Sequence, residues 1–135
     1  HQEVDTMRYR SSQGEIYKAL RQRLVRPGVA IGETAGYPRV EIHSFAENAP
    51  TDKDGQVRTL SLVVESMSAQ SYGHAVAMNE ENLDRLLADG WHVLGNGFTI
   101  LGIVPDQLTE LTETLDTKEI LYRQLQRLNI TIWQN

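Results

Sequence analysis

The stretch QVRTLSLVVESMSAQSYGHAVAMNEENLDRLLA, Gln56–Ala88, decides the fold class of this chain. In its first third the apolar residues Leu60, Leu62 and Val64 stand at every second position. Side chains two residues apart lie on the same face of a strand, so this spacing predicts a strand over 57–67 that buries one face. A break rich in Ser, Tyr and Gly then interrupts the pattern.

The second half of the same stretch has a helical period. Val76, Leu83, Leu86 and Leu87 fall on one side of a spiral with 3.6 residues per turn, and charged residues fall elsewhere. The pattern predicts an amphipathic helix over 74–88. A strand that leads directly into a helix indicates an α+β layout.

Another helix is predicted over 13–25. Its apolar residues repeat every four positions from Ile16 to Leu24. Ser12 and Glu15 have the spacing of a capping box, in which each side chain bonds a backbone N–H at the start of the helix. Pro27-Gly28 is expected to end it.

Strand patterns occupy much of the remaining chain. Alternating polar and apolar residues predict a strand over 38–45, preceded by a short extended piece over 29–31. The segments 91–94 and 98–104 flank Gly95-Asn96-Gly97. Because Asn and Gly readily adopt positive φ, these segments predict two strands joined by a tight hairpin.

The last third of the sequence is less regular. Pro105-Asp106 is expected to stop the preceding strand, and 109–116 to form either one helical turn or a loop. The residues 119–125 fit both a helix and a strand. We favour a final strand over 122–133, where alternation resumes.

These elements predict an α+β fold, an antiparallel or mixed β-sheet of about four to five strands with two main helices packed on one face. The core is expected to form from the apolar side chains on the inward faces of the elements. Its predicted members are Ile16, Leu20, Leu24, Val40, Ile42, Leu60, Leu62, Val64, Val76, Leu83, Leu87, Ile100, Leu128, Ile130 and Ile132.

The length of 135 residues favours a single domain, expected over 7–135. Met7 is a candidate native start, so residues 1–6 are either native or an added tag, and they are left out of the fold prediction. Residues 46–56, AENAPTDKDGQ, contain almost no apolar side chains. They predict an exposed, mobile loop between two strands.

Composition excludes several classes of function. The chain has no cysteine, which excludes disulfides, thiolate metal sites and cysteine nucleophiles. No apolar run approaches the roughly 20 residues that span a bilayer, and no signal peptide begins the sequence, so we expect an intracellular protein without a membrane partner. The formal net charge of −5 argues against direct recognition of nucleic acid.

The charges are distributed unevenly along the chain. Basic residues crowd the first 26 positions, and acidic residues cluster between 106 and 119. Two interpretations stay open: two solvated helix faces, or a polar molecule whose basic edge meets the acidic edge of a neighbour in a head-to-tail ring. The basic residues are Arg8, Arg10, Lys18, Arg21, Arg23 and Arg26, and the acidic ones are Asp106, Glu110, Glu113, Asp116 and Glu119.

No arrangement of residues indicates catalysis. The histidines His43, His74 and His92 do not have the spacing of metal ligands, so only folding could bring them together with a carboxylate. No serine lies in a nucleophile elbow, and no glycines form a phosphate-binding loop. We therefore predict no catalytic residue, no metal site and no cofactor, and expect that the protein is not an enzyme.

Three stretches carry a family resemblance: GEIYKALRQRL (14–24), LSLVVESMSAQSYGHAVAMNEENLDRLLA (60–88) and ILYRQLQRLNITIW (120–133). With the order of the elements, they resemble the tail terminator, or tail-completion, proteins of long-tailed bacteriophages and prophages. In such families a strand ending in Ser feeds a helix rich in Ala, Asn and Leu, and an aromatic-Arg pair, here Tyr122-Arg123, precedes the last strand. The acidic segment 105–119 is longer than the resemblance leads us to expect.

The resemblance implies a structural virion-assembly protein. Members of such families form a ring, usually hexameric, that caps the tail tube and provides the surface on which the head docks. The implied partners are further copies of this chain, the tail tube protein and the head–tail connector protein. The implied location is the virion tail, and the host bacterial cytoplasm during assembly.

Together with the charge pattern, the resemblance predicts a set of protein-interface residues. They are Arg21, Arg23, Arg26, Glu110, Glu113, Asp52, Lys53 and Asp54. The alternative is a small ligand-binding domain or enzyme of unrelated host function, with a pocket between sheet and helices. Ligand binding by the monomer would favour the alternative, and concentration-dependent rings would favour the assembly protein.

Overall fold

The computed structural model describes residues 9–32, 36–48 and 56–135. In sequence order the elements are α1 (Gln13–Leu24), β1 (Ala30–Ile31), β2 (Arg39–Glu47), β3 (Val57–Ser68), α2 (Tyr72–Leu87), β4 (Phe98–Thr114) and β5 (Ile120–Gln134). The strands form one sheet in the order β1-β2-β3-β5-β4. Only β1 and β2 are parallel neighbours, and the other neighbours are antiparallel.

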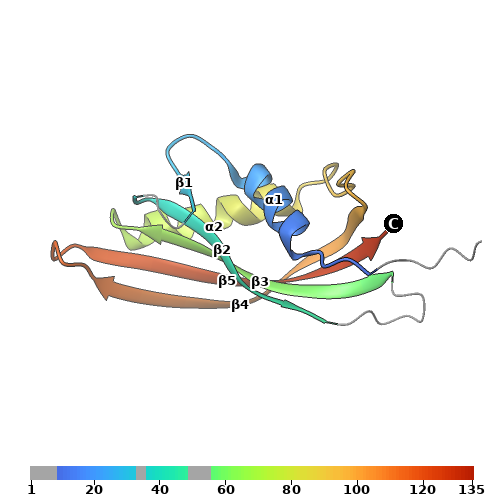
Figure 1. Cartoon of the computed structure of the whole chain (residues 1–135). Helices are drawn as coiled ribbons and strands as arrows, with labels where there is room; N and C mark the ends of the chain where they lie inside the picture. Colours follow the sequence, from blue (N-terminus) through green and yellow to red (C-terminus); the bar gives the residue numbers. More distant parts are fainter. Residues whose placement is uncertain (1–8, 33–35, 49–55) are drawn as a thin grey trace, which may run out of the picture.

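Both helices lie against the same face of the sheet, and neither covers the opposite face (Figure 1). The α+β prediction, with a mixed sheet and two helices on one face, is therefore confirmed. The short extended piece expected over 29–31 is β1. Strand β5 begins at Ile120, so the ambiguous residues 119–125 belong to a strand rather than to a helix.

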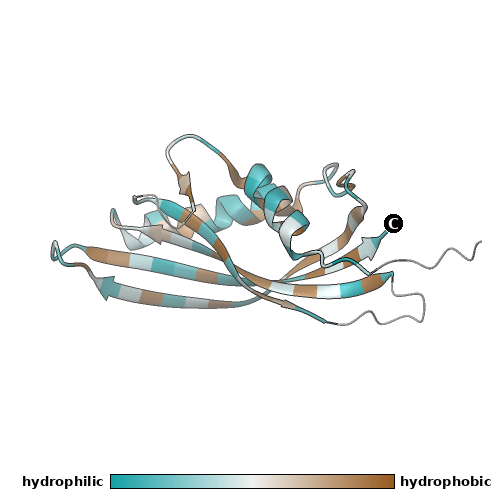
Figure 2. Ribbon diagram, in the orientation of Figure 1, coloured by the Kyte–Doolittle hydropathy of each residue, from teal (hydrophilic) through white to brown (hydrophobic). Residues whose placement is uncertain are grey.

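The core lies between the helices and the central strands β3 and β5. Their even-numbered residues face the helices, and the register places Leu60 opposite Ile130 and Leu62 opposite Leu128. Apolar and polar residues alternate visibly along β5 (Figure 2). The predicted core is confirmed at twelve positions: Ile16, Leu20, Leu24, Val40, Ile42, Leu60, Leu62, Val64, Ile100, Leu128, Ile130 and Ile132.

The buried face of α2 differs from the predicted one. Val76 and Leu83 are only half-buried, and Leu87 is 45% exposed. The helix is rotated because it buries two amide side chains, whose bonds to the sheet make their burial tolerable. Asn79 donates to Gln126 Oε1 at 3.2 Å, and Asn82 donates to Ser66 Oγ at 2.9 Å. The remaining buried residues of the helix are Ala75, Met78 and Leu86.

Strand β4 is much longer than predicted. The expected stop at Pro105 and the expected loop or helical turn over 109–116 are both wrong, because β4 runs on to Thr114 and pairs with β5 as far as Ile120. A proline is tolerated here because β4 lies at the edge of the sheet and its register shifts between Pro105 and Leu108.

The hairpin before β4 is shorter than predicted. The expected strand over 91–94 is reduced to one isolated bridge between Val93 and Thr99. The turn forms, but its positive φ values are at Gly95 (+72°) and Gly97 (+96°) rather than at the expected pair Asn96-Gly97. Its glycines permit this conformation without strain.

The predicted capping box at the start of α1 does not form. Ser12 has helical dihedral angles and makes no side-chain cap bond. Its hydroxyl instead donates to Glu47 Oε2 at 2.7 Å. Glu15 accepts from Asn96 Nδ2 at 2.7 Å rather than from the backbone of Ser12.

The expected loop over 46–56 is also narrower at its beginning, since Ala46 and Glu47 belong to β2. Asn48 donates its backbone N–H to the carbonyl of Thr59 at 2.9 Å, which continues the pairing of the two strands. Residues 49–55 lie outside the described part of the chain, so the predicted mobility of this segment stays a prediction.

Candidate assembly interface

The outer part of the β4–β5 hairpin, residues 104–120, is here called the arm. Every residue of β4 from Val104 to Thr114 is exposed. In Figure 1 the arm extends past the beginning of α2 and ends at the tip of the sheet. The inner edge of β4 pairs with β5, and β5 pairs with β3 as far as Tyr122, so only the tip over 113–121 extends beyond β3. An exposed edge strand with a projecting tip is typical of a segment that binds a partner.

The arm combines acidic and apolar side chains. Within residues 104–120, five acidic residues and one lysine give a formal charge of −5 + 1 = −4. Large apolar side chains lie exposed among them, and their exposed fractions range from 43% to 61%. These are Val104, Leu108, Leu111 and Ile120.

The outer edge of β4 has few backbone partners. Within the residues that the structure describes, the segment 92–94 bonds this edge, through Leu94 N–H to the Phe98 carbonyl and Ile100 N–H to the His92 carbonyl. Beyond Ile100, no backbone hydrogen bond reaches the edge from the described residues. Such an edge can accept a further strand or loop.

Two predicted interface residues lie on the arm in different environments. Glu110 accepts from Tyr72 Oη at 2.6 Å and from Gln124 Nε2 at 2.9 Å. Both bonds lower the pKa of the Glu110 carboxyl, and the bond from Tyr72 has the larger effect. The bond between Tyr72 and Glu110 also raises the pKa of Tyr72. Glu113 is 3.4 Å from the Arg123 guanidinium. Glu110 is thus held to α2, whereas Glu113 lies further along the arm.

The three predicted interface cations at α1, Arg21, Arg23 and Arg26, also lie in different environments. Arg21 is exposed and contacts the Tyr17 hydroxyl at 3.4 Å. Arg23 donates through Nε to the Arg85 carbonyl at 2.8 Å, and its guanidinium lies 5.8 Å from the ring centroid of Trp91.

The third cation, Arg26, donates to the carbonyls of Leu24 and Met78. Burial lowers its pKa, and the nearby positive charge of Arg85 lowers it further. Arg23 and Arg26 therefore connect α1 and the residues after it to α2.

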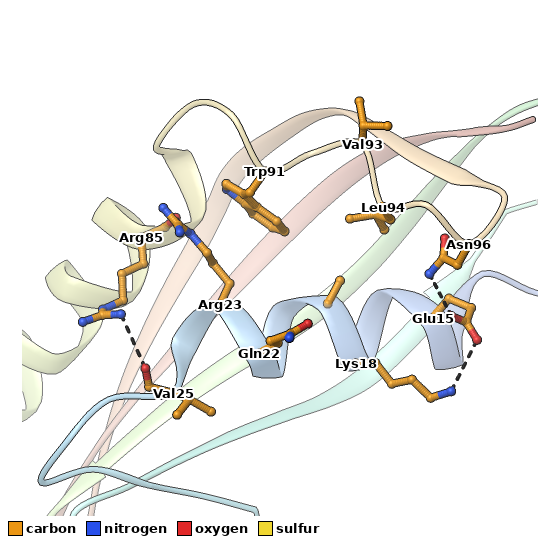
Figure 3. A pocket seen from close by; sticks show the side chains of 11 residues that line it. Glu15, Lys18, Gln22, Arg23, Val25, Arg85, Trp91, Val93, Leu94 and Asn96 are labelled. Atoms are coloured by element: carbon orange, nitrogen blue, oxygen red, sulfur yellow. Dashed lines mark hydrogen bonds and ion pairs between the residues drawn. The ribbon is translucent and has the colours of Figure 1, made fainter.

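A groove opens between α1, the end of α2 and the segment 91–96, with a volume of about 580 Å³. Figure 3 shows Trp91, Val93 and Leu94 on one side and the α1 residues Lys18 and Arg23 on the other. Val93 is 78% exposed. The indole Nε1 of Trp91 is buried and has no acceptor among the described residues. The groove is lined by apolar side chains of the segment 91–94 and by the cations Lys18, Arg23 and Arg85, and it was not predicted from the sequence.

The predicted interface residues do not come together within one chain. Strand β4 starts beside the groove at Phe98 and ends at the tip of the arm at Thr114. At about 3.3 Å per residue, its 17 residues separate the two places by about 50 Å. Asp52, Lys53 and Asp54 lie outside the described residues.

A network of hydrogen-bonded polar side chains on the face of the sheet that carries no helix was also not predicted from the sequence. Glu65 is 3% exposed, and its carboxylate meets His43 Nε2 at 2.8 Å and Arg123 Nε at 2.5 Å. The bond to Glu65 raises the pKa of Arg123. The three residues come from β2, β3 and β5, so their meeting depends on strand register, which the sequence does not reveal.

The described residues also bear on the requirements of a metal site and of a membrane-spanning helix. Among them, no three His, Asp or Glu side chains gather in a way that could hold a metal ion. Neither described helix is long and apolar enough to cross a bilayer.

Comparison with solved structures shows a shared fold. The chain superposes on one chain of a particle described as the virion of a native gene transfer agent (GTA), with a TM-score of 0.67. The match covers 93% of this chain and 98% of that chain, at 16% sequence identity. No protein-family model matches the sequence, and no curated protein matches it.

Proposed function

We propose that this chain is a structural virion-assembly protein of a phage or phage-like particle. It caps the tail tube as a ring, expected to be hexameric, and joins the tail to the head. The observation that supports this most is the superposition on a GTA virion chain, which runs almost from end to end of both chains. It therefore concerns the whole arrangement of helices and strands rather than one shared motif.

The surface of the molecule supports a ring over a symmetric pair. The acidic arm and the basic groove are different surfaces about 50 Å apart on the same chain. Contacts between unlike surfaces join copies head to tail, and such contacts close into rings when the rotation between copies permits. The partners in this proposal are further copies of the chain, the tail tube protein and the head–tail connector protein.

The direct test uses the cognate tail tube protein, which genes adjacent to this one would identify. Tubes are mixed with the purified chain and examined by electron microscopy and sedimentation. We expect one ring at one end of each tube and an arrest of tube growth. Tubes that bind no chain and continue to grow would contradict the proposal.

Charge reversal tests how the ring is held together. The variant carrying Arg21→Glu and Arg23→Glu is expected to lose rings at low salt, and adding Glu110→Lys and Glu113→Lys is expected to restore part of them. Exposed ion pairs contribute only about 0–1 kcal/mol each, so the rescue should be partial and sensitive to salt. The control Lys118→Glu, on the arm, should retain rings. Equal assembly of all variants would remove the charge argument.

A second candidate function rests on the groove alone. Its volume of about 580 Å³ is that of a small-molecule site. In that case a small ligand would raise the melting temperature of the isolated chain, and Val93→Asp would abolish the shift. A ligand screen without any shift, together with ring formation on tubes, would dismiss this candidate.

A further inference from the structure

We propose that the groove beside α1 receives the arm of a second copy of this chain. The inference rests on the proposed ring and specifies its contact: the arm tip near Glu113 and Asp116 of one copy lies in the groove lined by Lys18, Arg23 and Val93 of the next. The geometry does not allow this contact within one chain, because β4 holds the two places about 50 Å apart.

The electrostatic properties of the two surfaces are complementary. The arm has a formal charge of −4 (five acids and one lysine). The rim of the groove carries the cations Lys18, Arg23 and Arg85. Lys18 is paired with Glu15 at 3.4 Å and Arg85 with Glu81 at 2.6 Å. Among the described residues, no carboxylate forms an ion pair with Arg23. A carboxylate from the arm would supply one.

The apolar surfaces match as well. The groove exposes Val93 at 78% beside Trp91, and the arm exposes Leu111 at 45% and Ile120 at 46%. Burying these side chains against one another removes apolar surface from water on both partners, which is the main source of affinity at an interface. The charges then set register and orientation.

Self-pairing of two arms is disfavoured. If β4 of one copy paired with β4 of another, the acidic residues Asp106, Glu110 and Glu113 would face like charges along the new edge. The groove offers opposite charges instead. Each copy has one arm and one groove, so the contact leaves a free arm at one end and a free groove at the other until the ring closes.

Cysteine cross-linking tests the contact directly, since the chain contains no cysteine. One variant carries Val93→Cys in the groove and Asp116→Cys at the arm tip, and is treated with a short thiol cross-linker at high protein concentration and on tail tubes. We expect a ladder of trimers and larger species. The single-cysteine variants cannot proceed beyond dimers.

A matched pair, Glu80→Cys with Asp116→Cys, serves as the control because Glu80 is exposed on α2 outside the groove. Melting curves verify that each variant is folded. A ladder in the groove pair but not in the control supports the proposal. A folded groove pair that yields no more multimers than the control, both in concentrated solution and on tubes, overturns it.

Two further lysine variants test whether cross-linking depends on the opposite charges of groove and arm or only on random collisions between copies. Lys18→Glu replaces a cation of the groove rim by a carboxylate and should reduce the ladder about two- to fivefold, as expected from one exposed ion pair. Lys118→Glu makes the arm more acidic and should leave the ladder at least as strong. Equal loss in both variants would contradict the proposed orientation of the charges.

The result is distinguishable from failure of the proposed function. If the chain caps tubes but no ladder forms, the arm-in-groove contact is wrong and the capping role stands. If a ladder forms but tubes remain uncapped, the arm-in-groove contact is supported and the proposed role in capping the tail tube is wrong.

Discussion

Arg58 has no exposed surface, although it carries a permanent charge. Its guanidinium donates to Glu47 Oε2 at 3.1 Å, and also to the Arg10 carbonyl and to Gln134 Oε1. It also lies 4.3 Å from the ring centroid of Tyr9. One side chain thus connects the N-terminal segment to β2, β3 and the end of β5.

Replacing Arg58 should therefore destabilise the whole fold. Arg58→Ala leaves Glu47 buried without its cation, and breaking a buried pair costs about 3–5 kcal/mol. Urea unfolding would measure this loss. The control Lys18→Ala removes an exposed pair and should change the free energy of unfolding by about 0–1 kcal/mol. Similar small losses in both would mean that Arg58 is not a structural clamp.

The carboxylate of Glu47 should make the stability of the fold depend on pH. Burial alone would raise its pKa, but hydrogen bonds from Ser12, Arg58 and Ser11 lower it by more, so the net shift is downward. A depressed pKa in the folded state stabilises the protein above the ordinary carboxyl pKa of 4.5, and this contribution is lost as the pH falls through the folded value.

Glu47→Gln should consequently lower stability most near neutral pH, with a difference from the wild type that shrinks in acid. Urea midpoints measured from about pH 7 to about pH 3 give the comparison. A difference that stays constant across this range would contradict the assigned role of the carboxylate.

At the scale of the element, α2 offers a direct test of which face is buried. Leu86 is fully buried, and its neighbour Leu87 is 45% exposed. Leu86→Ala should cost about 2–5 kcal/mol, and Leu87→Ala well under half of that, because only the first leaves a cavity. Chemical denaturation measures the free energy of unfolding of both variants and shows which of the two side chains is buried. A larger loss at Leu87 would mean that Leu87, a predicted core residue, is buried in place of Leu86.

The elements also show what the sequence could and could not predict. The periods of β3 and α1 identify their buried faces correctly, since the central positions of those faces are apolar. The face of α2 was misjudged because Asn79 and Asn82 count as polar in any pattern, yet they are buried with partners on the sheet. The length of β4 was underestimated because an exposed edge strand has no hydrophobic alternation to reveal it.

At the scale of the whole molecule, the sequence shows that basic and acidic residues are segregated, but it does not show how far apart they lie in the fold. The segregation of Arg23 from Glu113 is visible in the sequence, and the structure places them at opposite ends of β4. The groove could not be predicted, because it forms where α1 meets the segment 91–96 through tertiary packing. The bond from Asn96 to Glu15 and the contact of Arg23 with the Trp91 ring hold the two elements together.

The long edge of β4 has a consequence for the protein before any partner is present. A strand edge that is exposed from Val104 to Thr114 is a template for uncontrolled fibril growth. A proline and three acidic residues on this strand disfavour its pairing with β4 of another copy. They are Pro105, Asp106, Glu110 and Glu113. A variant with Pro105→Val, Asp106→Thr and Glu110→Thr should form thioflavin-positive fibrils at concentrations where the wild type stays clear. The control Glu80→Thr with Glu81→Thr on α2 should remain clear as well, and fibrils from the control alone would refute this protective role.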